Sequence, residues 1–251
     1  MISNLIYKSA YTLEKLCAFA QGKGFGSRSI RQEIAVSRRM MKFLDPQLLM
    51  IDIGGNIGNY TYNLRKNFKQ AEIHIFEPSA VNVDKLNKRF QSDRLITINP
   101  VGISSSEGEF LLYSNELGSG IASLSKRRLD HFNIDLNFSE QIYTIRFESY
   151  WINKLCKRHI NLVKLDIEGH ELDALLGFGS AIEAIQLIQF EFGGCNLDTH
   201  TTFQDFYYFF SDHNYEIFRI TPFGSQKINK YSEIDEFYST TNFIAKNKSL
   251  I

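Results

Sequence analysis

The chain has 251 residues, enough for one α/β domain with a short extension but too few for two full domains of ordinary size. Its 28 basic and 28 acidic residues balance, so the charge indicates neither a nucleic-acid partner nor an anionic membrane surface. The three cysteines are far apart and outside C-x-x-C spacing, which excludes a disulfide framework and fits a reducing compartment. We expect a cytoplasmic protein without an integral membrane segment, because no long apolar run and no signal-peptide pattern is present.

Residues 1–45 are expected to form an N-terminal helical extension. Apolar residues recur at helical spacing over 4–20, glycines interrupt the pattern over 22–26, and a second helical pattern runs from Ser29 toward Pro46. We expect the extension to pack against the main domain, residues 46–251, or against a second copy of the chain. A homodimer through these helices is therefore a candidate assembly, and no chemistry is expected from the extension itself.

Strands and helices alternate at the start of the main domain. The pattern predicts strands at 48–53, 72–76 and 95–101 and helices at 57–68 and 79–90. Such alternation predicts a parallel sheet with helices on both faces.

The alternation then pauses at two strand-like segments, 108–113 and 141–147, which flank a long polar loop. They indicate an inserted β-hairpin, and a loop of this length is usually functional or mobile. We interpret the basic run Lys126–Arg128 in this loop as solvated.

The alternation resumes after the hairpin. The predicted elements are a helix at 149–156, a strand at 161–167, a helix at 170–176, a strand at 185–192, an aromatic-rich helix at 201–211 and closing strands at 215–220 and 240–245. The predicted fold class is α/β, with a Rossmann-like, mostly parallel sheet whose last strand is antiparallel, helices on both faces, the inserted hairpin and the helical extension.

The most informative segment is Met50–Thr61, a buried strand that breaks into a glycine turn and then begins a helix. The next predicted strand ends at Glu77 and Pro78. This half-fold binds nucleotide-like ligands, because the turn lets a ligand approach the backbone and the acid accepts hydrogen bonds from ribose hydroxyls. The alternative is a strand, turn and helix without a ligand.

The glycine spacing argues against a dinucleotide. Ile53 stands where the G-x-G-x-x-G fingerprint needs its first glycine. Asp52 would place a carboxylate at the lip of the strand, which suits a cation and repels a pyrophosphate. S-adenosyl-L-methionine (SAM) carries an ammonium and a sulfonium but no phosphate, so the pattern favours SAM over NAD.

Acidic residues follow the predicted strands with unusual regularity. Asp52, Glu77, Asp166 with Glu168, and Glu191 each stand at a strand end beside a turn. Ligands of open parallel sheets bind at this edge. Each acid alone could be a first-turn residue that favours the helix dipole, but together they favour one shared cationic ligand.

The segment Lys164–Glu171 contains the candidate catalytic groups. Asp166 and Glu168 could hold the methionine ammonium, accept the proton of an attacking hydroxyl, or both. His170 is a third candidate base because its ordinary pKa is near neutrality, although a water-facing helix residue is an equal alternative. The remaining histidines lack metal-ligand spacing, so no metal site is predicted.

Together these motifs resemble the FkbM-type SAM-dependent methyltransferases, which have the class I Rossmann-like fold. The matching segments are Asp52–Thr61, Phe76–Ser79 and Lys164–Glu171, with weaker matches at 99–104 and 241–245. The resemblance covers residues 46–246. It implies O-methylation of a hydroxyl on a saccharide or related natural product.

The resemblance also implies residue roles. Asp52, Gly54, Asn56 and Gly58 would shape the methionine end of the pocket. Glu77, followed by Pro78, would hold the ribose, and Asp166 and Glu168 would face the methyl-transfer site. The sequence departs from the family pattern at Gly55, where alanine is common, and at Pro100, where a small residue is more usual.

The leading hypothesis is a SAM-dependent O-methyltransferase acting on a saccharide or related natural product, as in glycan biosynthesis. A lipid, peptide or polyketide hydroxyl is the alternative acceptor. An NAD-dependent oxidoreductase is disfavoured by the incomplete glycine fingerprint and the absence of a Tyr-x-x-x-Lys pair. The retained acids disfavour a non-catalytic scaffold.

Overall fold

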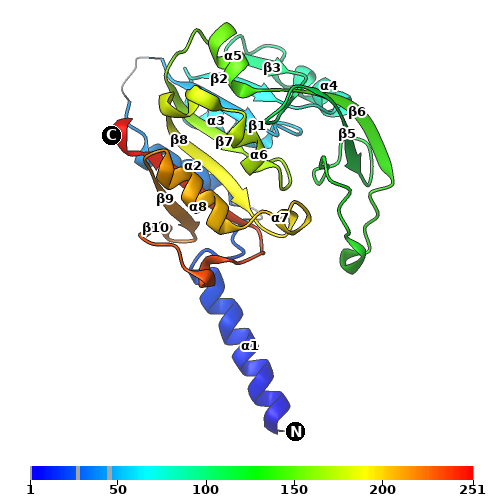
Figure 1. Cartoon of the computed structure of the whole chain (residues 1–251), viewed down its shortest axis with the longest axis vertical. Helices are drawn as coiled ribbons and strands as arrows, with labels where there is room; N and C mark the ends of the chain where they lie inside the picture. The colour runs from blue at the N-terminus through cyan, green and yellow to red at the C-terminus, as the bar shows by residue number, and fades with distance from the viewer. Residues whose placement is uncertain (1, 27–28, 44–46, 251) are drawn as a thin grey trace.

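An eight-stranded sheet organises the computed structural model, which describes residues 2–26, 29–43 and 47–250. The strand order is β10-β9-β11-β8-β7-β1-β2-β3 (Figure 1). The strands are β1 (Leu49–Ile53), β2 (Glu72–Phe76), β3 (Ile96–Asn99), β7 (Ile160–Leu165), β8 (Ile185–Phe192), β9 (Tyr215–Thr221), β10 (Gly224–Ile228) and β11 (Thr241–Asn247).

The sheet is mostly parallel. The neighbours from β3 through β2, β1 and β7 to β8 all pair in parallel. The last strand, β11, runs antiparallel to both β8 and β9, which confirms the predicted class. The edge strand β10 pairs antiparallel with β9 and was not predicted, because its exposed sequence GSQKI lacks the apolar alternation of a half-buried strand.

Helices cover both faces of this sheet. They are α2 (Ile30–Met40), α3 (Asn59–Asn67), α4 (Ala80–Phe90), α5 (Phe147–Asn153), α6 (Glu171–Leu176), α7 (Cys195–Asp198) and α8 (Phe203–Asp212), with short 3₁₀ turns η1 (Asp130–Phe132), η2 (Gly179–Ala184), η3 (Glu233–Asp235) and η4 (Lys248–Leu250). Side chains alternate along a strand, so Ile51 packs with residues of α5, α6 and α8, whereas Met50 packs with residues of α2, α3 and α4. Phe203, Phe206 and Phe210 of α8 belong to the core, and Phe209 is partly buried against it.

The predicted insertion is a small second sheet. Strands β5 (Gly108–Ser114) and β6 (Phe138–Ile145) form the antiparallel pair, and the two-residue strand β4 (Gly102–Ile103) joins β6 in parallel. The connection between β5 and β6 returns toward the main sheet, where Ser123 Oγ donates a hydrogen bond to the carbonyl oxygen of Glu168 at 2.9 Å. This connection therefore contacts the candidate catalytic segment.

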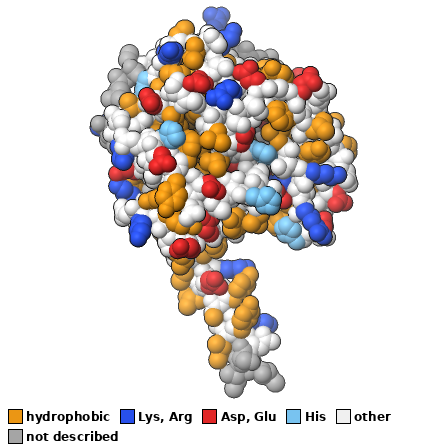
Figure 2. Space-filling model, in the orientation of Figure 1, with side chains coloured by type: hydrophobic (Ala, Val, Ile, Leu, Met, Phe, Trp, Pro, Cys, Tyr) orange, Lys and Arg blue, Asp and Glu red, His pale blue; other side chains and the backbone are white. Residues whose placement is uncertain are grey.

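The N-terminal extension has two separate parts. Helix α1 (Ile2–Ala20) projects away from the rest of the chain (Figure 1), and Figure 2 shows apolar side chains along it. Helix α2 instead packs against α3, β9, β10 and β11. The predicted domain boundary between residues 45 and 46 lies outside the described residues. In the described part of the chain, every helix is too short or too polar to cross a membrane.

Candidate functional site

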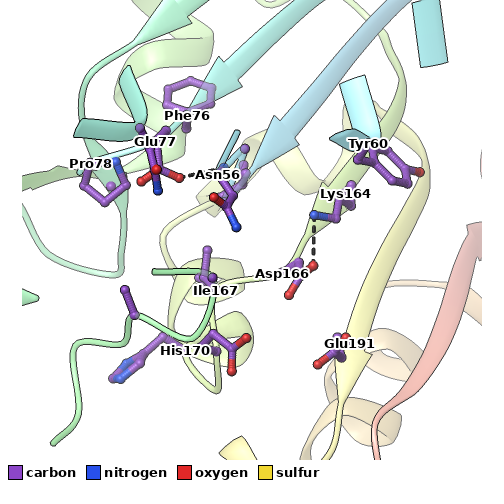
Figure 3. A pocket seen from close by; sticks show the side chains of 18 of the residues that line it. Asn56, Tyr60, Phe76, Glu77, Pro78, Lys164, Asp166, Ile167, His170 and Glu191 are labelled. Atoms are coloured by element: carbon purple, nitrogen blue, oxygen red, sulfur yellow. Dashed lines mark hydrogen bonds and ion pairs between the residues drawn. The ribbon is translucent and has the colours of Figure 1, made fainter. Parts of the chain in front are cut away.

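A cavity of about 300 Å³ lies at the carboxyl ends of β1, β2, β7 and β8. Figure 3 shows Glu77 and Pro78 at one end of it, Asp166 and Glu191 at the other, and Asn56 and Ile167 between them. The predicted site residues that line it are Gly54, Asn56, Glu77, Pro78, Asp166, Glu168 and His170. Residues as far apart in the sequence as Gly54 and His170 therefore share one cavity because parallel strands end at the same edge.

The glycine turn is shaped by close backbone contacts. Gly54 adopts φ +80°, and a Cβ atom there would lie 1.9 Å from the carbonyl oxygen of Asp166. Gly58 adopts φ +79°, and its Cβ would lie 2.5 Å from the ring of Phe90. Both positions need glycine, because the backbone is left-handed there and no space is left for a Cβ atom. At Gly55 a Cβ would meet Ile75 Cγ2 at 2.2 Å, which explains why glycine stands at this position.

The N–H groups of this turn are already used within the protein. Gly54 and Gly55 donate to the carbonyl oxygen of Phe76 at 2.9 and 3.1 Å, and Gly58 donates to the carbonyl oxygen of Gly55. Asn56 donates to Oε2 of Glu77 at 2.7 Å. A pyrophosphate would need such donors, so this arrangement disfavours a dinucleotide.

The carboxylate of Glu77 binds the glycine turn and can still accept further hydrogen bonds. Its Oε1 accepts the N–H of Ser79 at 3.0 Å, and its Oε2 accepts that of Asn56. Burial raises the pKa of this carboxyl, and the two backbone donors oppose that rise. A carboxylate has about four lone-pair sites, so about two remain for ribose hydroxyls.

Asp52 is not at the lip of the strand, contrary to the sequence interpretation. It is fully buried, and the cavity lining does not include it. The residues on either side, Ile51 and Ile53, face one core, which turns Asp52 toward the opposite face. There Oδ2 accepts a 2.6 Å hydrogen bond from Thr61, and Oδ1 lies 3.6 Å from Nζ of Lys164.

Lys164 joins Asp52 to the cavity. Its Nζ lies 3.0 Å from Oδ2 of Asp166 and above the ring of Tyr60. Burial alone would lower the pKa of Lys164, but the carboxylates of Asp166 and Asp52 outweigh it and raise that pKa. Sequence reasoning missed this role, although a lysine inside an otherwise apolar strand is a signal that a partner must be present.

Glu168 is held by an unexpected arginine. Nη1 of Arg127 lies 2.6 Å from Oε2 of Glu168, and Nε of Arg127 lies 3.0 Å from Oδ2 of Asp198. The Arg127 side chain is 9% exposed, so the prediction of a solvated basic run is wrong at this residue. Burial, and then the charge of Asp166, raise the pKa of Glu168 to about 8 against the effect of Arg127.

The turn after β7 carries the candidate groups Glu168 and His170, and Glu171 holds this turn in place. The carboxylate of Glu171 accepts the N–H groups of Ile167 at 2.8 Å and Gly169 at 3.1 Å. His170 precedes α6, and its Nε2 lies 3.0 Å from Oγ of Ser125 in the β5–β6 connection. Burial lowers the pKa of His170, so its imidazole is neutral at pH 7. The side chain is half-buried in the cavity wall.

Two further acids line the cavity. Glu191 extends from β8 near Asp166 (Figure 3), and burial followed by the charges of Asp166 and Glu168 raises its pKa well above the ordinary value. Glu33 comes from α2 and accepts hydrogen bonds from Asn242 at 3.1 Å, from Ser29 and from Gln189. The N-terminal extension thus forms part of the cavity wall, a role its sequence did not indicate.

The lining fits SAM in three parts. Glu77 offers acceptors for a ribose, and the apolar side chains of Ile103, Leu112 and Ile142 offer a surface for an adenine. The carboxylates beyond Asn56 suit an ammonium and a sulfonium. Among the described residues no cluster of three or more His, Cys, Asp and Glu is placed to hold a metal, and a reaction without metal stays a prediction.

Comparisons with known proteins agree with this chemistry. The family model described as "Methyltransferase FkbM domain" matches residues 52–217, more than half of the chain. Hexuronic acid methyltransferase AglP of Haloferax volcanii is 26% identical over 164 residues, a match that covers 64% of this chain and 62% of AglP. The chain therefore matches less than two thirds of that relative's length.

Solved structures also align with the chain. An rRNA methylase from Streptococcus thermophilus has a TM-score of 0.48 at 10% identity, with 88% of this chain and 97% of that chain covered. A putative methyltransferase from Streptococcus mutans in complex with SAH has a TM-score of 0.48 at 10% identity, with 88% and 98% covered.

Proposed function

This chain belongs to the FkbM methyltransferase family, and from this premise we propose that it methylates a hydroxyl group of a saccharide or related natural product. It is a methyltransferase, and SAM is its methyl donor. The name of the Haloferax volcanii relative, a hexuronic acid methyltransferase, supports a sugar-like acceptor. The observation that carries the proposal is that Glu77 and the acids at the carboxyl ends of β7 and β8 line the same cavity.

We assign cofactor binding to the turn and to the end of β2. Glu77 would accept the ribose hydroxyls, with Pro78 beside it, while Gly54, Asn56 and Gly58 form the turn against which the methionine part lies. Asp52 acts indirectly, because its carboxylate anchors Lys164 rather than the ligand. Bound SAM supplies a methyl group activated by its sulfonium.

Asp166 is the base that we assign. Its side chain lines the cavity and is 37% exposed, compared with 20% for Glu168. The ion pair with Arg127 keeps Glu168 from acting as the base. The pKa of Glu168 is about 8, so this carboxyl is mostly protonated at pH 7. Asp166 would take the acceptor's hydroxyl proton as the new C–O bond forms and the C–S bond breaks, while Glu168 and His170 position the acceptor.

Calorimetry and turnover test these roles together. We expect SAM and S-adenosylhomocysteine to bind and NAD not to bind. Asp166→Asn should retain S-adenosylhomocysteine affinity while turnover falls about a hundredfold, a usual loss for a general base. The matched control is Asp198→Asn, which removes the other carboxylate bound to Arg127 but lies outside the cavity lining. NAD binding without SAM binding would refute the function, and full turnover in Asp166→Asn would refute the base.

The proposal also covers the assembly of the protein and its cellular compartment. Helix α1 leaves Leu5, Ile6, Leu13, Leu16 and Phe19 exposed, and we propose that a second copy of the chain covers them in a homodimer. The three cysteines form no disulfide, which supports a reducing, cytoplasmic setting.

A further inference from the structure

The cavity is lined by many more acidic than basic side chains. Its acidic residues are Glu33, Glu77, Asp166, Glu168 and Glu191, and its basic residues are Lys164 and His170. The imidazole of His170 is neutral at pH 7 because burial lowers its pKa. Lys164 is consequently the single formal positive charge in the cavity wall.

That positive charge is already neutralised. Nζ of Lys164 lies 3.0 Å from Asp166 and 3.6 Å from Asp52, and its side chain is 8% exposed. The nearby guanidinium of Arg127 is shared between Glu168 and Asp198 and lies outside the cavity lining. Within the described residues, no cation of the wall remains for a carboxylate or phosphate of an acceptor.

Glu191 lies beside the base. Leu165 of β7 and Phe190 of β8 are register partners, so the next residues, Asp166 directly after β7 and Glu191 within β8, lie side by side. Glu191 lines the cavity, and Figure 3 shows no hydrogen bond or ion pair between its carboxyl and the other side chains drawn. It can therefore accept a hydrogen bond from a hydroxyl or ammonium group placed next to Asp166, whereas an acceptor carboxylate there would lie beside the carboxylate of Asp166 with no free cation of the wall to pair with.

We infer that the methylated sugar carries no acidic group: it is a neutral or amino-bearing saccharide whose hydroxyl or ammonium donates to Glu191, and it is not a uronate. The inference rests on the proposed O-methylation of a saccharide. It separates this chain's acceptor from the hexuronic acid for which AglP is named.

The first test identifies the labelled sugar. The full chain is incubated with deuteromethyl-SAM and an extract of acceptor glycans, the products are hydrolysed to monosaccharides, and the labelled sugar is identified by ion exchange and mass spectrometry. Label in a neutral or amino sugar is expected. Label in a uronic acid overturns the inference and leaves the proposed function intact, whereas label in a non-sugar, or no label despite S-adenosylhomocysteine binding, overturns the proposed function and the inference with it.

The second test measures the selectivity that Glu191 provides. The glycoside identified above is compared with the same glycoside oxidised to a carboxylate at its primary alcohol. We expect kcat/KM at least about tenfold lower for the oxidised form, a difference of about 1.4 kcal/mol. Glu191→Gln should reduce this ratio several-fold, while Glu109→Gln, at an exposed carboxylate on β5, should leave the ratio unchanged. Equal use of both glycosides by the native chain, or an unchanged ratio in Glu191→Gln, overturns the inference.

Discussion

Asp52 of β1 and Lys164 of β7 are register partners, and their Oδ1 and Nζ atoms lie 3.6 Å apart in the sheet. Removing one partner of a buried ion pair leaves an uncompensated charge. We therefore expect Lys164→Met to lower the free energy of unfolding by about 3 kcal/mol, as measured by urea denaturation.

The double variant Lys164→Met with Asp52→Asn should recover much of that loss, because it removes the fully buried one of the two carboxylates that Lys164 pairs with. Lys227→Met, which breaks the exposed pair with Glu216, is the matched control and should cost less than about 1 kcal/mol. A loss in Lys164→Met no greater than in this control would show that the pair does not stabilise the strand edge.

Glu77 is expected to contribute strongly to cofactor affinity. Its carboxylate both fixes the N–H of Asn56 and faces the cavity. Because hydrogen bonds to charged groups are worth about 1.5–3 kcal/mol, Glu77→Ala should weaken S-adenosylhomocysteine binding roughly ten- to hundredfold in calorimetry. Glu72→Ala, at the opposite end of β2, is the control for strand stability. Equal affinity in both variants would remove Glu77 from the binding site.

Glu168 makes stability depend on pH. Its pKa is raised from 4.5 to about 8 in the folded chain, first by burial and then by Asp166. The folded state therefore binds more protons than the unfolded state between these values, so the contribution of Glu168 is full below pH 4.5 and is lost as pH rises toward about 8.

Substitution by a neutral isostere isolates this contribution. Glu168→Gln should make the decline in unfolding free energy between pH 5 and pH 8 shallower, by an amount on the order of 1–3 kcal/mol after allowance for partial exposure. Urea denaturation across that range measures the slope, and Glu109→Gln on the exposed hairpin serves as control. Parallel pH profiles for the native chain and Glu168→Gln would contradict the raised pKa.

Local patterns were enough to predict most of the sheet and the shared edge of the site. The glycines at 54 and 58 marked the turn because their backbone is left-handed, and the acids marked strand ends. The side of the sheet that Asp52 faces could not be predicted. Every residue of β1 is buried, so the strand shows no alternation of buried and exposed positions. Arg127 and Glu33 reach the site only through tertiary packing, from a loop and from a helix whose sequences do not encode their partners.

Helix α1 provides the last prediction. Ile6, Ser9, Leu13 and Leu16 are separated by three, four and three residues, the spacing of a seam between two supercoiled helices. Leu13 is 62% exposed, so Leu13→Lys would remove little within one chain but place a charge in the centre of the seam. Light scattering should show the native chain as a dimer and Leu13→Lys as a monomer with unchanged S-adenosylhomocysteine affinity. Thr12→Lys, beside the seam, should remain dimeric, and a native chain that is monomeric at micromolar concentration would contradict the proposed assembly.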